Sequence, residues 1–157
     1  MLCLPIAFFA LLPRLKTAEQ FAAVLDASKL KSSNSDKMSG VWRSAHFALH
    51  LAPIAALSLP PTSEIRPTVG VICPKRWAKR AVTRNTIKRQ IYAVTYELEA
   101  QLPTACLVLR LASGFSKQEF VSATSPRLKS VVRQELLTLL GKITHSEASM
   151  KLAGGRV

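Results

Sequence analysis

Apolar and polar positions along the chain change period several times, and each change marks the boundary of a predicted element. Alternation with a period of two predicts strands, and a period of 3.6 predicts helices. The pattern predicts a single two-layer α+β sandwich with the order α-β-β-β-α-β-α. The expected elements are residues 17–28, 41–44, 46–51, 68–73, 81–102, 105–111 and 125–141.

The helix expected over residues 81–102 has two faces of opposite character. One face is an apolar stripe that predicts packing on the core, made of Ile87, Ile91, Val94 and Leu98. The other sector is polar and contains Arg84, Asn85, Lys88, Arg89, Tyr92 and Tyr96. A basic helical face is often only a solvated surface. However, no acidic residue occurs between Glu64 and Glu97, which favours a polyanionic ligand near the amino-terminal half of this helix.

The first helix is expected to begin at Thr17, because threonine is a common amino-terminal cap. Its predicted buried face consists of Ala18, Phe21, Ala22 and Leu25. In the strand 46–51, Phe47, Leu49 and Leu51 alternate with His46, Ala48 and His50. The first set is expected to face the core. His50, in the second set, is expected to face solvent.

Residues 68–73 and 105–111 are almost continuously apolar and are expected to be strands buried on both faces, joined through the basic helix as a βαβ unit. The last helix is expected to start with Ser125 as its cap and Pro126 at its first position, and to end at Gly141. Its predicted core positions are Leu128, Val131, Val132, Leu136 and Leu139. Residues 29–40 predict a mobile loop, and the proline-rich residues 52–67 predict a connection.

These elements divide the chain into an extension at residues 1–13, a domain at residues 14–141 and a flexible tail at residues 142–157. The extension contains an apolar run from Leu2 to Leu12, which is far shorter than the ~18 apolar residues that span a bilayer. It has no basic segment before it and no small-residue cleavage site after it. We therefore expect either an extension packed loosely on the domain or an upstream choice of start codon, and not a targeting signal.

Charge narrows the class of partner. The 157 residues include 22 Lys and Arg but only 9 Asp and Glu, which gives a net charge of +13. This excess implies a polyanion or a membrane surface as the partner. Cys3, Cys73 and Cys106 are far apart in apolar segments, so we expect reduced, buried thiols in a cytoplasmic protein.

The sequence contains no set of residues that predicts catalysis by the protein alone. His46, His50 and His145 lack metal-ligand spacing and have no nucleophile beside them in the pattern. There is no glycine-rich phosphate loop. Glu97 and Glu99 are two residues apart, so on a helix they do not face each other. A binding subunit is therefore expected.

Three motifs resemble the bacterial ribonuclease P protein subunit. The run AKRAVTRNTIKRQ, from Ala78 to Gln90, is similar to the RNR signature of that family, which reads arginine, asparagine, arginine, any residue, lysine, arginine. Thr86 stands at the third signature position, where the family has arginine. The segment RLKTAEQF, from Arg14 to Phe21, is similar to the amino-terminal RLxxxxxF pattern. Residues 68–71, followed by Lys75 and Arg76, resemble the third strand of the family.

The resemblance implies a fold similar to the second domain of ribosomal protein S5, and a role in tRNA 5′ maturation. It implies binding of the catalytic RNA by Lys75, Arg76, Lys79, Arg80, Arg84, Asn85, Lys88, Arg89 and Tyr92. It implies a cleft for the 5′ leader of precursor tRNA at Phe21, Leu25, His50 and Lys88. Leu25 stands where a second stacking aromatic is expected, and Tyr92 where a further arginine is common. Hydrolysis is then expected from the RNA subunit with Mg²⁺, with one protein monomer per RNA.

Two other classes of function remain open at this point. A structural RNA-binding protein, such as a ribosomal component, would share the basic helix but would show no preference for a leader. A membrane-surface protein would use the apolar run with the positive charge. Against the second class, the basic residues are concentrated some sixty residues from that run.

Overall fold

The structure, a computed structural model, describes residues 12–29, 39–57, 66–116, 118, 120, 122 and 125–153, with side chains described as far as residue 144. Residues 30–38 of the predicted serine-rich loop and residues 58–65 of the predicted proline-rich connection lie outside these residues. So do Cys3 and all of the predicted amino-terminal extension except Leu12 and Pro13.

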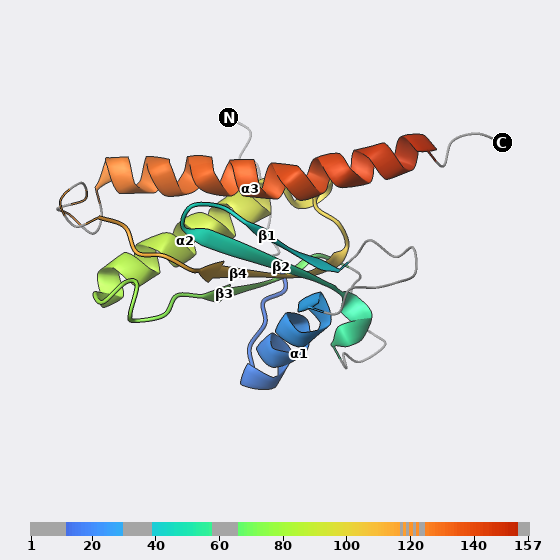
Figure 1. Ribbon diagram of the computed structural model, residues 1–157, viewed down its shortest axis with the longest axis horizontal. Coiled ribbons are helices and arrows are strands. Elements are labelled where there is room, and N and C mark those ends of the chain that lie inside the picture. Colours follow the sequence, from blue (N-terminus) through green and yellow to red (C-terminus); the bar gives the residue numbers. More distant parts are fainter. Residues whose placement is uncertain are drawn as a thin grey trace, which may run out of the picture.

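The elements follow the predicted order, and all four predicted strands are present (Figure 1). The helices and strands are α1 (Ala18–Lys29), β1 (Gly40–Arg43), β2 (Phe47–Pro53), β3 (Thr68–Ile72), α2 (Ala81–Glu97), β4 (Ala105–Leu111) and α3 (Pro126–Ala153), with short 3-10 turns at Ile54–Ala56 and Glu99–Gln101. The sheet order is β1-β2-β4-β3. β4 pairs antiparallel with β2 and parallel with β3, so α2 is the crossover of a βαβ unit.

The outer edge of β3 is paired with the chain that precedes α1. The amide of Val69 donates to the Pro13 carbonyl at 2.9 Å, and the amide of Leu15 donates to the Val69 carbonyl at 3.0 Å. Leu12 and Leu15 are buried. The folded domain therefore begins at least as early as Leu12, and this segment covers a sheet edge that would otherwise leave backbone groups unpaired.

Helices cover both faces of the sheet, so the predicted two-layer arrangement needs a third layer. α2 and α3 pack on one face and α1 on the other (Figure 1). The first core contains Phe47, Leu49 and Leu51, as predicted. An exposed second face for β2 is wrong, because Ala48 and His50 are only 2% and 6% exposed. Alanine and histidine are not strongly apolar, so the local pattern did not reveal that α1 covers them.

The predicted cap of α1 is confirmed, but its buried face is rotated. The amide of Gln20 donates to Thr17 Oγ1 at 3.3 Å, and Gln20 Oε1 accepts from the Lys16 amide at 2.8 Å. Ala18 and Ala22 are exposed, whereas Val24 and Ser28 are buried. Two alanines bury little apolar area, so the larger Val24 side chain and the hydrogen bond made by Ser28 determine the orientation of the helix.

α3 is longer than predicted. Ser125 caps it, since Ser125 Oγ accepts from the Leu128 amide at 3.2 Å. The predicted end at Gly141 is wrong, because the helix continues to Ala153. None of the described glycines has a positive φ, so Gly141 does not terminate the helix as a left-handed cap. Ile143 continues the buried side that includes Leu139 and Leu140.

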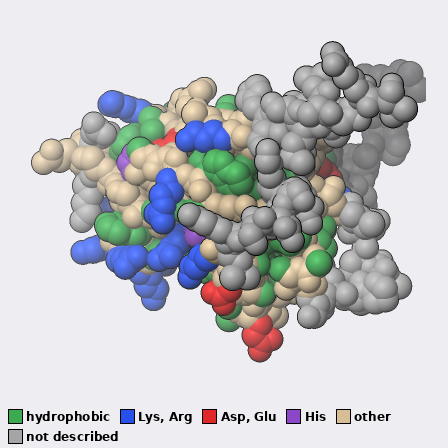
Figure 2. Space-filling view, turned by 45° about the vertical axis from the view of Figure 1, so that its right-hand side comes forward, with side chains coloured by type: hydrophobic (Ala, Val, Ile, Leu, Met, Phe, Trp, Pro, Cys, Tyr) green, Lys and Arg blue, Asp and Glu red, His purple; other side chains and the backbone are tan. Residues whose placement is uncertain are grey.

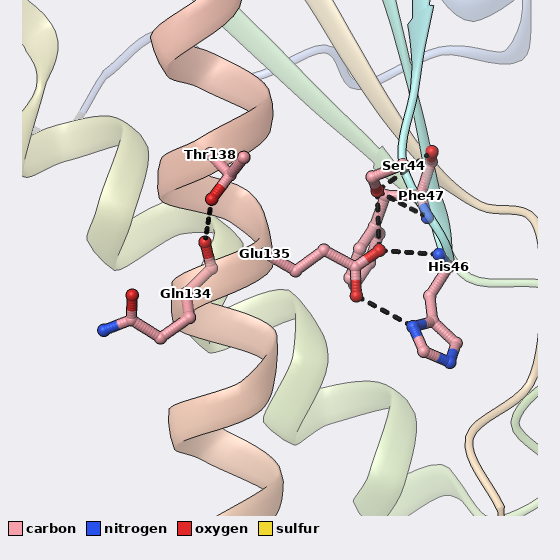
Figure 3. A network of polar contacts seen from close by, with 6 residues as sticks. All are labelled: Ser44, His46, Phe47, Gln134, Glu135 and Thr138. Carbon is pink, nitrogen blue, oxygen red and sulfur yellow. Dashed lines mark hydrogen bonds and ion pairs between the residues drawn. The ribbon is translucent and has the colours of Figure 1, made fainter.

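A carboxylate on α3 holds the turn between β1 and β2 (Figure 3). Glu135 accepts hydrogen bonds from Ser44 Oγ at 2.6 Å, from the His46 amide at 2.6 Å and from His46 Nδ1 at 2.8 Å. Burial alone raises the pKa of Glu135, but the hydrogen bonds from Ser44 and His46 lower it by more, so the net pKa lies below its ordinary value. The His46 ring also stacks on Phe115 at 4.1 Å between centroids. The Glu135 contacts attach the β1–β2 turn to α3, and the Phe115 contact attaches it to the segment that follows β4.

Candidate nucleic-acid interface

The linker from Pro74 to Arg80 carries four exposed cations into α2, namely Lys75, Arg76, Lys79 and Arg80. It is a defined turn. The Pro74 carbonyl accepts from the amides of Trp77 at 3.1 Å and Ala78 at 3.2 Å. Ala78 is 5% exposed and belongs to the main core. The linker cations are therefore displayed from a backbone that is anchored at its centre.

Arg84 ties this linker to α2. Its Nη1 atom donates to the carbonyl oxygens of Ala78 at 2.9 Å and Lys79 at 2.8 Å. The side chain is half-buried. The family resemblance of the motif implied a direct RNA contact for Arg84. The structure gives one of its terminal nitrogens a structural partner, so Arg84 acts first as a positioning residue for the linker.

Lys88 and Tyr92 follow Arg84 at intervals of four residues and lie along the same flank of α2, beside the end of β3. The charges of Lys88 and Arg84 both act on the Cys73 thiol, although burial dominates and raises the Cys73 pKa to about 11. The Arg14 guanidinium lies 3.9 Å from the centroid of the Tyr92 ring. This flank therefore continues across the β3 edge to Arg14, which the sequence pattern did not assign to the site.

Asn85 and Arg89 are exposed next to this flank, as the helical spacing predicts. Within the described part of the chain, none of the cations from Lys75 to Arg89 forms an ion pair with a carboxylate. Figure 2 shows Lys and Arg side chains gathered toward the lower left of one face of the molecule. Unpaired cations on a rigid frame are the electrostatic arrangement that binds phosphates.

The two acidic residues at the end of α2 form ion pairs with cations outside the α2 flank. Glu97 binds Arg133 of α3 through both of its carboxylate oxygens. The hydrogen bond from Arg133 holds the pKa of Glu97 below its ordinary value. Glu99 accepts from Arg66, with Nη2 at 2.8 Å. These acids fasten the carboxyl-terminal end of α2 and do not neutralise its amino-terminal half.

Thr86, which departs from the RNR signature, points inward. It is 7% exposed, and its hydroxyl donates to the Val82 carbonyl at 2.9 Å. It adjoins Ile87, which is fully buried together with Ile91 and Val94, as the apolar stripe predicts. The residue at the third signature position therefore belongs to the inner side of α2 in this chain.

The predicted leader residues of α1 lie on the other face of the sheet. Phe21 is half-buried and packs over Gly70 of β3, since a Cβ added to Gly70 would lie 2.5 Å from Phe21 Cε1. Leu25 is half-buried one turn later and packs against the same small core. Lys88 is on α2, which covers the opposite face. The structure therefore does not bring Lys88 into one cleft with Phe21 and Leu25; the β3 edge separates them.

His50 is not available for stacking or for phosphate contact, and both sequence-based expectations for it are wrong. Its ring is buried, and Nδ1 lies 3.0 Å from Ser28 Oγ of α1. Burial lowers its pKa, and the charges of Arg110, Arg43 and Lys29 lower it further. A neutral His50 therefore joins β2 to α1 beneath a group of cations.

That group of cations was missed by the sequence pattern. Arg43 and Arg110 are both in register with Ala48, on either side of it, so the three residues form a row across β1, β2 and β4. Lys29 ends α1 on the same side. A single arginine inside the apolar strand ACLVLRL was the available signal. Arg43, Arg110 and Lys29 are called the α1-side cations below.

Among the described residues, no three His, Cys, Asp or Glu side chains lie close enough together to hold a metal ion. The same residues include no helix whose apolar stretch is long enough to cross a membrane. Cys73 and Cys106 are free thiols, and burial raises the pKa of Cys106 to about 11.

Fold and site thus define a small basic α+β protein with an unneutralised cationic flank. The Ribonuclease P family model matches residues 12–140. The chain is 32% identical to the ribonuclease P protein component of Paraburkholderia xenovorans (strain LB400) over 112 residues, which are 68% of this chain and 74% of that protein. It is 32% identical to that of Bordetella petrii over 123 residues, 78% of this chain and 85% of that protein. The chain belongs to the ribonuclease P protein family, which functions in tRNA processing.

Solved structures agree with the fold. The ribonuclease P protein of Staphylococcus aureus aligns with a TM-score of 0.58 at 13% identity, covering 83% of this chain and 96% of that one. That of Thermotoga maritima aligns with a TM-score of 0.54 at 17% identity and the same two coverages. The predicted α+β class is confirmed. Membership of the family implies partnership with the ribonuclease P RNA.

Proposed function

We propose that this protein binds the ribonuclease P RNA through the linker and the α2 flank, and holds the 5′ leader of precursor tRNA on the α1 side of its sheet. By doing so it promotes endonucleolytic removal of the leader. The observation that carries this proposal is the set of cations from Lys75 to Arg89, which have no carboxylate partner in the described part of the chain.

Contact with the catalytic RNA is assigned to the exposed cations. Lys79, Arg80 and Arg89 are exposed, and Arg84 holds the linker against α2. Each cation placed on a phosphate releases condensed counterions, which makes the binding constant fall with salt. Because the linker and helix are joined by hydrogen bonds, these contacts form without a large cost in ordering the protein.

Contact with the leader is assigned to Phe21 and Leu25 together with the α1-side cations. Phe21 offers a half-buried aromatic ring on which a base can stack. Arg110, Arg43 and Lys29 lie close enough to His50 to influence its protonation, which places positive charge on the same side of the sheet. A strand that touched both this surface and Lys88 would have to pass the β3 edge, where Arg14 lies.

In this proposal the RNA performs hydrolysis, and the Mg²⁺ ions it needs are held by RNA and substrate. The side chains of the protein neutralise phosphates where the two RNAs meet, and this lowers the Mg²⁺ concentration needed for assembly. The protein binds as a monomer, one per RNA.

The test is reconstitution with a bacterial ribonuclease P RNA at low Mg²⁺, using precursor tRNAs with and without a 5′ leader. The protein is expected to raise the cleavage rate and to tighten binding of the leader-bearing substrate. Arg89→Ala is expected to weaken RNA binding. It is also expected to reduce the salt slope, which is the steepness with which the logarithm of the binding constant falls with the logarithm of the salt concentration, by about 0.7 to 0.9. Lys129→Ala, which removes the same charge from an exposed position on α3, is the matched control.

Two results would contradict the proposal. The first is a cleavage rate and leader dependence that the wild-type protein leaves unchanged. The second is an equal loss of RNA affinity in Arg89→Ala and Lys129→Ala, because charge alone would then matter and not the α2 flank.

A further inference from the structure

Trp77 has a large apolar side chain that is not packed into the core. It is 38% exposed, and Val82 is the other large apolar residue that is exposed among the described ones. Its position in the sequence KRWAKR places two cations on each side of it within three residues. An exposed aromatic ring among cations is the combination with which proteins bind unpaired nucleotides, because cations hold the backbone and the ring stacks on a base.

The main chain of Trp77 is held in place although its ring is exposed. Its amide donates to the Pro74 carbonyl at 3.1 Å. The following residue, Ala78, is buried, and its carbonyl accepts from Arg84 at 2.9 Å. On the other side, a Cβ added to Gly114 would lie 3.0 Å from the Trp77 carbonyl oxygen, so the chain after β4 packs directly against it. A ring displayed from such a turn loses little freedom on binding.

One side of the ring already has a partner. The Arg76 guanidinium lies over the Trp77 ring at 5.2 Å from the centroid. This cation orients the indole and keeps a positive charge beside it. The remaining exposed surface of the ring is open to a flat, apolar ligand, and the surrounding charges require that ligand to carry phosphates.

We propose that Trp77 stacks on an unpaired nucleobase of the RNA partner, with Arg76 on its ring and Lys75, Lys79 and Arg80 on the adjoining phosphates. This inference rests on the proposed function and adds a stacking site that is separate from Phe21. The base can belong to the catalytic RNA or to the leader, and the two arms of the test distinguish these sources.

The test compares Trp77→Phe with Trp77→Leu in the full chain. Both variants keep an apolar side chain, but only phenylalanine keeps a ring. In one arm, binding to a bacterial ribonuclease P RNA alone is measured; in the other, binding of leader-bearing and leaderless precursor tRNA to the assembled complex. Trp77→Leu is expected to lose about 5-fold to about 140-fold in affinity in one arm, and Trp77→Phe to stay close to wild type.

Salt dependence and fluorescence give independent readouts. Since Trp77→Leu removes no charge, its salt slope is expected to equal that of wild type. The chain has two tryptophans, so in a Trp42→Phe background the emission reports Trp77 alone. Stacking on a base is expected to quench this emission when the RNA that carries the base is added.

The inference is overturned if Trp77→Leu binds as tightly as Trp77→Phe in both arms, or if Trp77 emission does not change on binding. It is also overturned if the salt slope of Trp77→Leu falls by the value that one phosphate contact gives, about 0.7 to 0.9, or by more. The ring would then only be positioning its neighbouring cations. These results leave the proposed function intact as long as the wild-type protein still activates the RNA. Failure of the wild-type protein to do so would instead reject the proposed function.

Discussion

Arg84 Nη1 donates a hydrogen bond of 2.8 Å to the carbonyl oxygen of Lys79, so a side chain in α2 reaches back to the linker that precedes the helix. Lys79 itself is exposed. The contact makes the linker and the flank of α2 one rigid surface. It also separates two roles that the sequence motif combines, because the Arg84 guanidinium holds the linker, whereas Lys79 and Arg89 are exposed and are the residues proposed to contact phosphates.

Arg84→Ala is therefore expected to cost more than one phosphate contact. Without the guanidinium, the Ala78 and Lys79 carbonyls lose a charged donor, and the linker cations lose their fixed position. The free energy of unfolding is expected to fall by about 1 to 2 kcal/mol. The salt slope of RNA binding is expected to fall by more than the value of about 0.9 that one contact gives.

The control for this prediction is Arg89→Ala, since Arg89 is exposed on the same helix. It removes the same charge and should reduce the slope by no more than one contact, with little change in stability. Binding titrations over a range of salt, with urea unfolding of each variant, provide both quantities. Identical slopes for the two variants would show that Arg84 serves only as a phosphate ligand.

His50 gives the protein a stability that depends on pH. Burial and the charges of Arg110, Arg43 and Lys29 lower its pKa from the ordinary value of 6.5, so the unfolded chain takes up a proton more readily than the folded one. The stabilisation that depends on neutral His50 is then fully present above pH 6.5, and it is lost as the pH falls from there toward the pKa of His50 in the folded chain. The free energy of unfolding should decrease over this window.

His50→Asn tests this dependence, because its side-chain amide can still bond to Ser28 but does not titrate. The variant is expected to be less stable at neutral pH, since it fills less volume, but to show a flatter pH profile. His46 is present in both chains, so its contribution cancels in the difference. Denaturant unfolding between about pH 5 and about pH 8 makes the comparison. Parallel profiles would mean that His50 titrates alike in the folded and unfolded chains.

Features that depend on spacing within one helix or strand were predicted from the sequence, whereas features that depend on the pairing of distant strands were missed. The caps at Thr17 and Ser125 and the stripe from Ile87 to Val94 follow from spacing within one element. The row formed by Arg43 and Arg110 arises from pairing between strands far apart in the chain, which no local pattern contains. The burial of His50 likewise depends on where α1 docks.

The docking of α1 depends on the absence of a side chain at Gly70. A Cβ there would lie 2.5 Å from Phe21 Cε1 and 2.7 Å from Leu15 Cδ1. Gly70→Ala is therefore expected to displace the Phe21 ring and to lower the free energy of unfolding by about 1 to 3 kcal/mol. Urea unfolding measures the change, and leader binding by the reconstituted complex should weaken with it.

A double-mutant cycle with Phe21→Ala shows whether this cost comes from the ring. Once the ring is removed, adding a methyl group at Gly70 meets less obstruction. The cost of the double variant should then fall short of the sum of the single costs by about 0.5 kcal/mol or more. Additive costs would place the strain at Leu15 or in the backbone of β3 and not at Phe21.

Thr86→Arg restores the third residue of the RNR signature, yet it is not expected to improve RNA binding. Thr86 is 7% exposed and donates to the Val82 carbonyl, next to the buried Ile87. A longer, charged side chain there must displace packed neighbours, which is expected to lower the free energy of unfolding by about 1 to 3 kcal/mol.

Ala93→Arg is the matched control, because Ala93 is exposed on the same helix and gains the same charge. The free energy of unfolding of Ala93→Arg should change by less than about 0.5 kcal/mol. The prediction fails if Thr86→Arg is as stable as wild type and binds ribonuclease P RNA more tightly than Ala93→Arg. An arginine at position 86 would then reach the RNA despite the inward orientation of Thr86.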